Sequence, residues 1–335
     1  MTTVVVTGAS AGVGRAVVRR FARPGIRLAL IARGRERLER AAGEVRAAGA
    51  EALVLPVDVA DAAAVDDAAA RTEAAFGPID VWINAAMVTV FAPVAEMTAG
   101  EYRRVTEVTY LGCVHGTLAA LQRMKPRDRG TIVQVGSALA YRSIPLQSAY
   151  CAAKSAIVGF TDSLRCELIH DRSDVRLTVV HLPAVDTPQF DWARSKMPRR
   201  PQPLPPIFEP ELIADAVHHA AWHPRREYWL GWSAAKAILA QKVAPGIADH
   251  LLAHRAWDGQ MTDEPRNADR PDNLFEPVAG DQGARGRFAD RASTTSPAIW
   301  SSEHRTLLLG LAGMVLAGTA LAVFTARAAS RRAIR

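Results

Sequence analysis

Cysteine is scarce in this chain of 335 residues, and its three cysteines lie far apart. Cys113, Cys151 and Cys166 form no C-x-x-C pair of the kind that binds zinc, and an odd number cannot complete a disulfide framework. The nine histidines include no H-E-x-x-H pattern either. We therefore expect reduced cytoplasmic thiols and no bound metal.

Excess positive charge is also scarce outside the C-terminus. Lys and Arg exceed Asp and Glu by seven, but four of these seven net charges lie after residue 300. A nucleic-acid-binding domain typically carries a strongly basic face. The small excess in the main body predicts that nucleic acid is not a partner. A hydrophobic content of 49% excludes a disordered or fibrous chain.

A long uncharged run lies near the C-terminus. Residues 306–326 contain no charge and are bounded by Arg305 and Arg327. At about 1.5 Å rise per residue, a helix of this length spans the ~30 Å hydrocarbon layer of a bilayer. The run predicts a single-pass membrane anchor. The N-terminus has no signal-peptide pattern, so we expect the preceding residues in the cytoplasm. The four arginines after the run favour a cytoplasmic tail, which leaves open a helix that enters without crossing.

Short apolar runs alternate with longer helical patterns from Val4 to about Leu230. Strands are predicted at residues 3–7, 27–32, 52–56, 79–84, 130–136, 175–182 and 228–231. Strands that alternate with helices are typical of a doubly wound parallel sheet. We therefore predict an α/β, Rossmann-like fold with about seven strands.

Composition divides the chain into three regions. Residues 1–256 form the predicted sheet domain, which ends in a helix from about 234 to 256. Residues 257–300 are polar, without an apolar period, and predict a disordered linker. Residues 301–335 hold the membrane anchor and a basic tail.

Six prolines between residues 190 and 210 mark a long excursion within the first region. Such an excursion is a candidate substrate lid. The same stretch contains an R-x-x-P-x-x-P pattern that starts at Arg200, which leaves open a role as a peptide ligand for a partner domain.

A glycine-rich segment, Thr-Gly-Ala-Ser-Ala-Gly-Val-Gly, follows the first predicted strand and precedes a helix. Such a turn needs positive φ angles and a close approach of the backbone. The free N–H groups and the dipole of the helix start favour a pyrophosphate. The residues that we assign to phosphate binding are Gly8, Ser10, Gly12, Val13 and Gly14.

The residues after the second and third strands face the expected adenosine end of a dinucleotide. Arg33 stands where an acidic residue would bind the ribose 2′-hydroxyl, and a cation there suits a 2′-phosphate. A solvated arginine at a helix start is the alternative. Asp58 is placed to accept from the adenine amino group, and a helix N-cap is its alternative.

Ser137, Tyr150 and Lys154 follow the fifth predicted strand. A separation of four places Tyr150 and Lys154 on one face of a helix. A lysine beside a tyrosine favours the phenolate and lowers the pKa of the tyrosine, which is ~10 in the free residue. The three side chains therefore predict proton transfer near neutral pH.

Together these segments resemble the short-chain dehydrogenase/reductase family, in its subgroup with TGxxxGxG and YxxxK motifs, over residues 2 to about 232. The resemblance implies that Tyr150 is the general acid/base and that Lys154 lowers its pKa and holds the nicotinamide ribose. It also implies that Ser137 positions the substrate. The further cofactor contacts that it implies are Asp58 and Val59 after strand three, Asn84 after strand four, and Thr187 near the carboxamide.

Two departures from the family pattern affect the site. The Asn-Asn-Ala-Gly segment appears here as Asn84-Ala-Ala-Met87, so the first asparagine is kept. The asparagine that supports a proton-relay water corresponds to Thr109, whose hydroxyl could hold the same water. Thr109 is therefore a fourth candidate catalytic residue.

These features predict an oxidoreductase that transfers a hydride between NADP(H) and a carbonyl or alcohol. The expected substrate is a small lipophilic molecule, given the membrane anchor and the bulk of Met87. Two alternatives stay open: an NAD(H) enzyme of the same chemistry, and a cofactor-binding membrane scaffold or sensor with little turnover. The resemblance also implies a homo-oligomer through the helices that carry Thr109 and Tyr150.

Overall fold

The computed structural model describes residues 1–304 and Met314. The predicted membrane helix at 306–326 therefore lies outside the described residues, apart from Met314. Within the described part, no helix combines the length and the apolar character needed to cross a bilayer.

Seven parallel strands form the central sheet, in the order β12-β7-β6-β4-β1-β2-β3. The strands are β1 (Thr2–Thr7), β2 (Ile26–Ala32), β3 (Glu51–Pro56), β4 (Val81–Asn84), β6 (Gly130–Ser137), β7 (Val175–Leu182) and β12 (Glu227–Trp229). The predicted α/β fold and its seven strands are confirmed.

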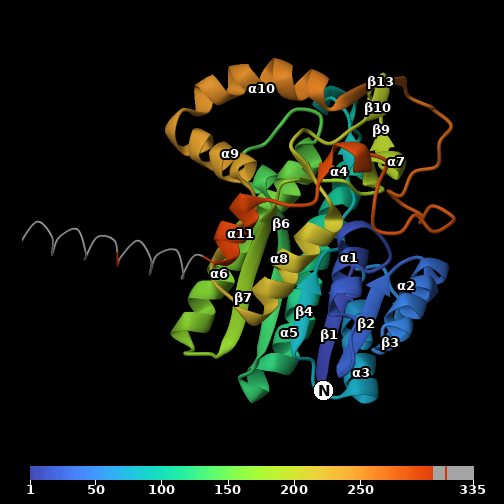
Figure 1. Cartoon of the computed structure of the whole chain (residues 1–335), viewed down its shortest axis with the longest axis vertical. Coiled ribbons are helices and arrows are strands. Elements are labelled where there is room, and N and C mark those ends of the chain that lie inside the picture. Colours follow the sequence, from blue (N-terminus) through green and yellow to red (C-terminus); the bar gives the residue numbers. More distant parts are fainter. Residues whose placement is uncertain (305–313, 315–335) are drawn as a thin grey trace, which may run out of the picture.

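Helices cover both faces of this sheet (Figure 1). Val4 and Val6 of β1 pack in one hydrophobic cluster, whereas Val5 between them packs in another. Successive residues of a strand point to opposite faces, so a strand between two helix layers is apolar throughout. One layer holds α1 (Gly12–Phe21), α2 (Arg35–Ala47) and α8 (Pro210–Trp222), and the other α3 (Ala62–Phe76), α5 (Gly112–Met124) and α6 (Ser148–His170).

The strand order reverses beside β1, which lies between β4 and β2. In open α/β sheets, ligands bind outside the carboxyl ends of the strands at such a switch point. Smaller elements surround this end of the sheet. They include β5 (Val90–Phe91), α4 (Ala99–Val105), β8 (Ala184–Val185), α7 (Gln189–Trp192) and β9 (Arg194–Ser195).

The single helix predicted at about 234–256 is two helices. α9 (Trp232–Val243) ends two residues before Pro245, and α10 (Pro245–Gly259) begins at that proline. A residue that precedes proline is disfavoured in the helical region, and Ala244 has φ −145° and ψ 63°. The proline therefore separates the two helices.

The prediction of a disordered linker at 257–300 is wrong. β13 (Met261–Pro265) pairs with β10 (Arg199–Pro201), and β14 (Ala292–Ser293) pairs with β11 (Ile207–Phe208). The segment then ends in α11 (Pro297–Glu303). Apolar residues at irregular spacing, such as Leu274 and Phe288, are buried against the domain. The segment, orange to red in Figure 1, therefore belongs to the sheet domain.

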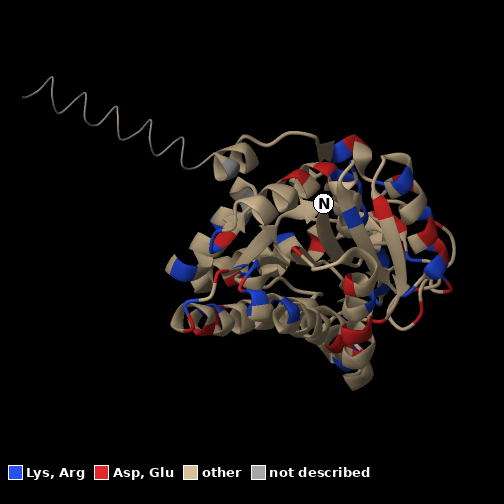
Figure 2. Ribbon diagram, turned by 90° about the horizontal axis from the view of Figure 1, so that it is seen from below, with Lys and Arg blue, Asp and Glu red and all other residues tan. Residues whose placement is uncertain are grey.

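The proline-rich excursion is also part of the fold. Arg200 forms ion pairs with Glu264 and Asp191, and Pro201 lies in the β10–β13 pair. These contacts hold the R-x-x-P-x-x-P stretch within the domain, so it is not a free peptide ligand in this structure. Figure 2 shows that basic and acidic residues are interspersed over the described chain.

Candidate active site

A cavity of about 400 Å³ lies at the carboxyl ends of the strands. Twelve of the predicted site residues line it: Gly8, Ser10, Gly12, Val13, Gly14, Arg33, Asp58, Val59, Ser137, Tyr150, Lys154 and Thr187. Asn84 and Thr109 are absent from its lining, although both lie within the described part of the chain.

The glycine loop between β1 and α1 has the shape of a phosphate cradle. Gly8 has φ +70° and Gly12 has φ +57°, which is the region that favours glycine. A Cβ on Gly14 would lie 2.1 Å from the carbonyl oxygen of Gly8. Only glycine permits this close passage of the backbone over the start of α1. The loop therefore fits a pyrophosphate.

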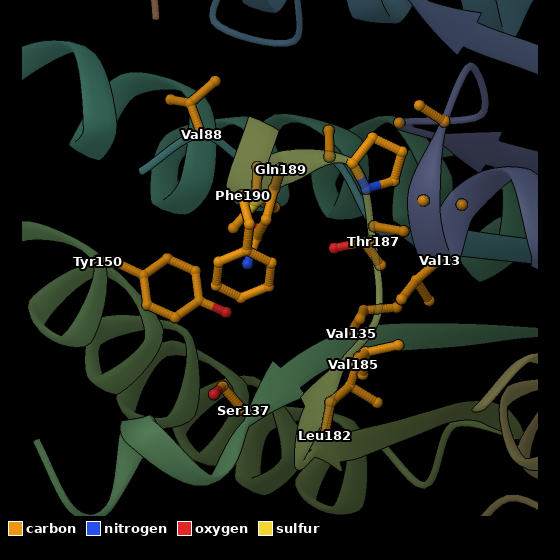
Figure 3. A pocket seen from close by; sticks show the side chains of 18 of the residues that line it. Val13, Val88, Val135, Ser137, Tyr150, Leu182, Val185, Thr187, Gln189 and Phe190 are labelled. Carbon is orange, nitrogen blue, oxygen red and sulfur yellow. The ribbon is translucent and has the colours of Figure 1, made fainter. Parts of the chain in front are cut away.

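Ser137 and Tyr150 face the same space in the cavity. Ser137 ends β6, and its hydroxyl oxygen accepts from the backbone N–H of Leu139 at 3.1 Å. Tyr150 lies in the first turn of α6 and is partly buried. Figure 3 shows both hydroxyls directed toward the open centre, with Phe190 and Thr187 on other sides of it. A carbonyl or alcohol group at this centre could contact both hydroxyls.

Lys154 lies one helical turn after Tyr150. Its Nζ donates to the carbonyl oxygen of Val135 at 2.6 Å and lies 5.6 Å from the centre of the Tyr150 ring. The side chain is buried, and this burial lowers the pKa of Lys154 to about 8. Lys154 is thus held in place by the strand that carries Ser137.

The expected lowering of the Tyr150 pKa is not what the structure shows. Burial raises the pKa of the Tyr150 hydroxyl above its ordinary value, and hydrogen bonding to Ser137 offsets this only in part. The reason is that desolvation disfavours the charged phenolate. At neutral pH the hydroxyl therefore keeps its proton and is suited to donate it.

Asn84 does not face the cofactor cavity, which corrects its assignment. Its Nδ2 donates to Gln134 at 2.9 Å and to Thr117 at 3.1 Å. Its Oδ1 accepts from the indole N–H of Trp82 at 2.8 Å. These bonds join β4 to the neighbouring central strand β6 and to α5, so Asn84 has a structural role.

The assignment of Thr109 to a relay water is corrected as well. Its hydroxyl donates to the carbonyl oxygen of Val88 at 2.9 Å and accepts from the N–H of Val88 at 3.1 Å. The side chain lies in a π-helical turn, Thr106–Leu111, and is buried. A hydroxyl has one proton to donate, and Val88 takes it. Thr109 therefore holds a residue of the cavity wall.

Arg33 and Asp58 line the adenosine end of the cavity and have internal partners. The Arg33 guanidinium donates to the carbonyl oxygens of Asn273 at 2.5 Å and Phe275 at 2.6 Å. It is therefore not a solvated arginine at a helix start. Asp58 accepts from the N–H of Ala60 at 3.0 Å and forms an ion pair with Arg104.

Arg37 and Asn273 are among the cavity residues that the sequence did not indicate. Arg37, on α2, is 7% exposed, and its guanidinium lies 4.6 Å from the centre of the Trp192 ring. Asn273 reaches the cavity from the segment that was expected to be disordered. The spacing of four between Arg33 and Arg37 was a usable signal, whereas nothing in the local sequence marks Asn273.

Beside the polar residues Arg142 and Gln147, the substrate end of the cavity has apolar walls. They are supplied by Val88, Leu139, Phe190, Leu204 and Leu252, together with three prolines of the 190–210 excursion. Residues of the excursion therefore line the cavity, and its role as a substrate lid stays a prediction.

A doubly wound sheet with a glycine loop and a Ser, Tyr and Lys set at its switch point defines a nicotinamide-dependent oxidoreductase. The family model described as short chain dehydrogenase matches residues 2–198, more than half of the chain. The chain belongs to the short-chain dehydrogenase/reductase family, and its relatives support NAD(P)-dependent dehydrogenase or reductase activity.

Individual relatives agree with this class. The uncharacterised oxidoreductase YxnA of Bacillus subtilis is 30% identical over 279 residues, which are 83% of this chain and 78% of YxnA. The 2,3-dihydro-2,3-dihydroxybenzoate dehydrogenase of the same organism is 32% identical over 56% of this chain and 71% of its own length. The structure of an alcohol dehydrogenase from Thermococcus sibiricus, complexed with 5-hydroxy-NADP, is 30% identical. Its TM-score is 0.58, over 68% of this chain and 94% of that one.

Proposed function

We propose that this protein interconverts a carbonyl and an alcohol with NADP(H), and that Tyr150 transfers the proton. The observation that carries the proposal is the shared orientation of the Tyr150 and Ser137 hydroxyls (Figure 3), in the cavity that the glycine loop also lines. When bound, the nicotinamide supplies or accepts the hydride. Ser137 holds the substrate oxygen, and Tyr150 donates its proton to that oxygen during reduction.

Lys154 supports this chemistry from beneath Tyr150. Its ammonium is fixed by the Val135 carbonyl and lies 5.6 Å from the Tyr150 ring centre. A cation at this place favours the phenolate that forms as the proton leaves. The family match and the dehydrogenase relatives favour turnover over the scaffold or sensor alternative.

The preference for NADP(H) is supported by charge at the adenosine end of the cavity. Arg33 and Arg37 line it, and Arg104 contacts Asp58 beside them. Arg33 and Arg37 donate to main-chain carbonyls, which leave their positive charges unneutralised. A 2′-phosphate would supply the missing negative charge. The related Thermococcus enzyme was solved with an NADP derivative.

Replacing Arg33 by Ala tests this preference. We expect the affinity for NADPH to fall at least ~10-fold, because one charge-assisted hydrogen bond contributes ~1.5 to 3 kcal/mol. The affinity for NADH should change less than about twofold, since NADH has no 2′-phosphate. Fluorescence titration of both cofactors measures the two values. Equal losses for NADPH and NADH would show that Arg33 does not recognise the phosphate.

The apolar walls of the cavity support a lipophilic substrate. Val88, Phe190, Leu204 and Leu252 offer no charge to a polar molecule. Apolar pockets with a few polar groups orient a ligand by those groups and bind its body by burial. A panel of aldehydes, ketones and alcohols of increasing chain length should show kcat/KM rising with apolar length. A preference for short polar substrates would contradict this part of the proposal.

We also propose that the protein is attached to a membrane, with its catalytic domain in the cytoplasm. Support comes from the uncharged run at 306–326, outside the described residues, and from exposed apolar side chains on α9 and α10. The most exposed of these are Val243 at 82% and Ile247 at 74%. Large exposed apolar patches typically mark interaction sites.

Cell fractionation tests the attachment. The full chain should remain with membranes after carbonate extraction, and a chain that ends at His304 should not, because it lacks the 306–326 run. Ending at His304 keeps α11 and its contact between Arg225 and Ser302. Recovery of the full chain in the soluble fraction would refute the proposal.

A further inference from the structure

Residues 272–288, here called the strap, follow β13 and run along the whole predicted cofactor cleft. In Figure 1 this orange segment crosses the end of the sheet at which β1 and β2 terminate. We propose that the strap is part of the cofactor site: it retains the dinucleotide between turnovers and fixes the arginines that select NADPH. This inference rests on the proposed binding of a nicotinamide dinucleotide in the cavity.

The first contact of the strap is at the adenosine end. Its carbonyl groups at Asn273, Leu274 and Phe275 accept from the Arg33 guanidinium at 2.5, 3.4 and 2.6 Å. Leu274 also accepts from Arg104 Nε at 3.1 Å. An arginine has five N–H groups, so these three bonds orient Arg33 without using all of its donors. The remaining donors are available to a phosphate.

The second contact involves Arg37, one helical turn beyond Arg33. Its Nε donates to the carbonyl oxygen of Gly280 at 2.6 Å. The Arg37 guanidinium also packs against the Trp192 ring. Its Nη2 is buried and has no hydrogen-bond partner among the described residues. A buried donor without a partner is unfavourable. Since Arg37 lines the cavity, an anionic oxygen of the cofactor would satisfy it.

The strap continues past the phosphate loop to the predicted nicotinamide end. The carbonyl oxygen of Gly283 accepts from the N–H of Gly12 at 3.1 Å. Farther along, the N–H of Phe288 donates to Asp186 at 3.0 Å, next to Thr187. The strap is therefore held by four sets of contacts beside the cleft, at Arg33, Arg37, Gly12 and Asp186. A dinucleotide that lies from Arg33 to Thr187 would run alongside it for its full length.

Buried side chains hold the strap closed. Leu274 is 0% exposed and belongs to the hydrophobic cluster on one face of the sheet. Ala284 and Phe288 are also buried. Opening the strap at its adenosine end must withdraw Leu274 from this cluster, which costs hydrophobic burial. Exchange of the cofactor should therefore be slow, and slower than the binding of substrate.

Replacing Leu274 by Ala in the full chain tests the strap. We expect NADPH to dissociate at least ~10-fold faster, because a truncated anchor lowers the cost of opening. The ratio of NADH to NADPH dissociation constants should fall at least ~5-fold, because Arg33 loses its fixed orientation. Stopped-flow fluorescence, with bound NADPH displaced by excess NADP⁺, gives the rate. Fluorescence titration gives both dissociation constants.

A matched control is Leu168→Ala. Leu168 is 4% exposed on α6 and does not line the cavity, so the same truncation tests general destabilisation. We expect its NADPH dissociation rate to stay within about twofold of the parent. If Leu274→Ala does not fold, Arg37→Met serves instead. In Arg37→Met the affinity for NADPH should fall at least ~10-fold, because the lost contact is to an anionic oxygen of the cofactor. The affinity for NADH should stay within about threefold of the parent.

The outcomes separate the two proposals. An unchanged rate of NADPH release in Leu274→Ala would overturn the strap inference. Tighter NADPH binding in this variant would also overturn it, because the strap would then compete with the phosphate for Arg33. Unchanged NADPH affinity in Arg37→Met would overturn it as well. If the parent chain binds neither NADPH nor NADH, the proposed function itself fails.

Discussion

Replacing Tyr150 by Phe is expected to lower turnover by at least ~100-fold, the usual contribution of a positioned acid or base. The substitution removes the hydroxyl that faces Ser137 and keeps the ring beside the Lys154 ammonium. Because the packing is retained, NADPH should bind with nearly unchanged affinity. Steady-state rates and a fluorescence titration measure the two effects.

Tyr102→Phe is the matched control. The Tyr102 hydroxyl lies 2.7 Å from the Ser148 hydroxyl, and Tyr102 does not line the cavity. The turnover of the Tyr102→Phe variant should stay within about threefold of the parent, because this variant loses one ordinary hydrogen bond. Similar losses in both variants would indicate a structural effect and remove Tyr150 from the proposed mechanism.

The raised pKa of Tyr150 also predicts the pH dependence of the two directions. Reduction needs the protonated hydroxyl, whereas oxidation needs the phenolate. Burial keeps Tyr150 protonated at neutral pH. The value of kcat/KM for reduction should therefore stay high at neutral pH and fall only at alkaline pH. The value of kcat/KM for alcohol oxidation should rise with pH over the same range. Parallel pH profiles for the two directions would contradict this assignment.

Replacing Gly14 by Ala should abolish measurable cofactor binding. The new Cβ would lie 2.1 Å from the oxygen and 2.7 Å from the carbon of the Gly8 carbonyl, which are both backbone atoms. The loop cannot relieve this clash by moving a side chain, so its phosphate-binding shape should be lost. Overpacking of this kind typically lowers the free energy of unfolding by ~1 to 3 kcal/mol or more. Denaturant unfolding and NADPH titration measure the two losses.

Gly159→Ala is the matched control: it makes the same substitution at a position where the added Cβ meets no clash. A Cβ on Gly159, within α6, would meet no atom within 4 Å. Ala has the higher helix propensity by up to ~1 kcal/mol, so this variant should be at least as stable as the parent and bind NADPH normally. If both glycine variants bind NADPH equally well, the loop is not the phosphate site.

The sheet was predictable because the apolar pattern of each strand is visible in its own short stretch of sequence. Val4, Val5 and Val6 form an apolar run that ends in the glycine loop, and both faces of β1 are buried as that run predicts. The relation between Tyr150 and Lys154 follows from helical spacing alone. The break between α9 and α10 was also readable, since Pro245 marks it in the sequence.

The remaining features depend on contacts between distant parts of the chain. Arg33 meets Asn273 across 240 residues of sequence, and no period in the polar segment indicates that pairing. Asn84 and Thr109 were assigned to the site by position in a motif. Their side chains are instead bound by neighbours that only the packing of β4, β6 and the π-helical turn brings near. The local sequence pattern shows which residue types stand at these positions. It does not show which distant residues their side chains contact.

Transfer of deuterium from NADPH labelled at the nicotinamide C4 tests the central claim most directly. Purified full-length protein would be incubated with cofactor labelled on either face of the ring and with a lipophilic aldehyde or ketone. Mass spectrometry would then locate the label in the product. We predict one deuterium at the former carbonyl carbon, from one face only, with transfer nearly lost in Tyr150→Phe. Tight NADPH binding without label transfer to any carbonyl of a broad panel would contradict the account.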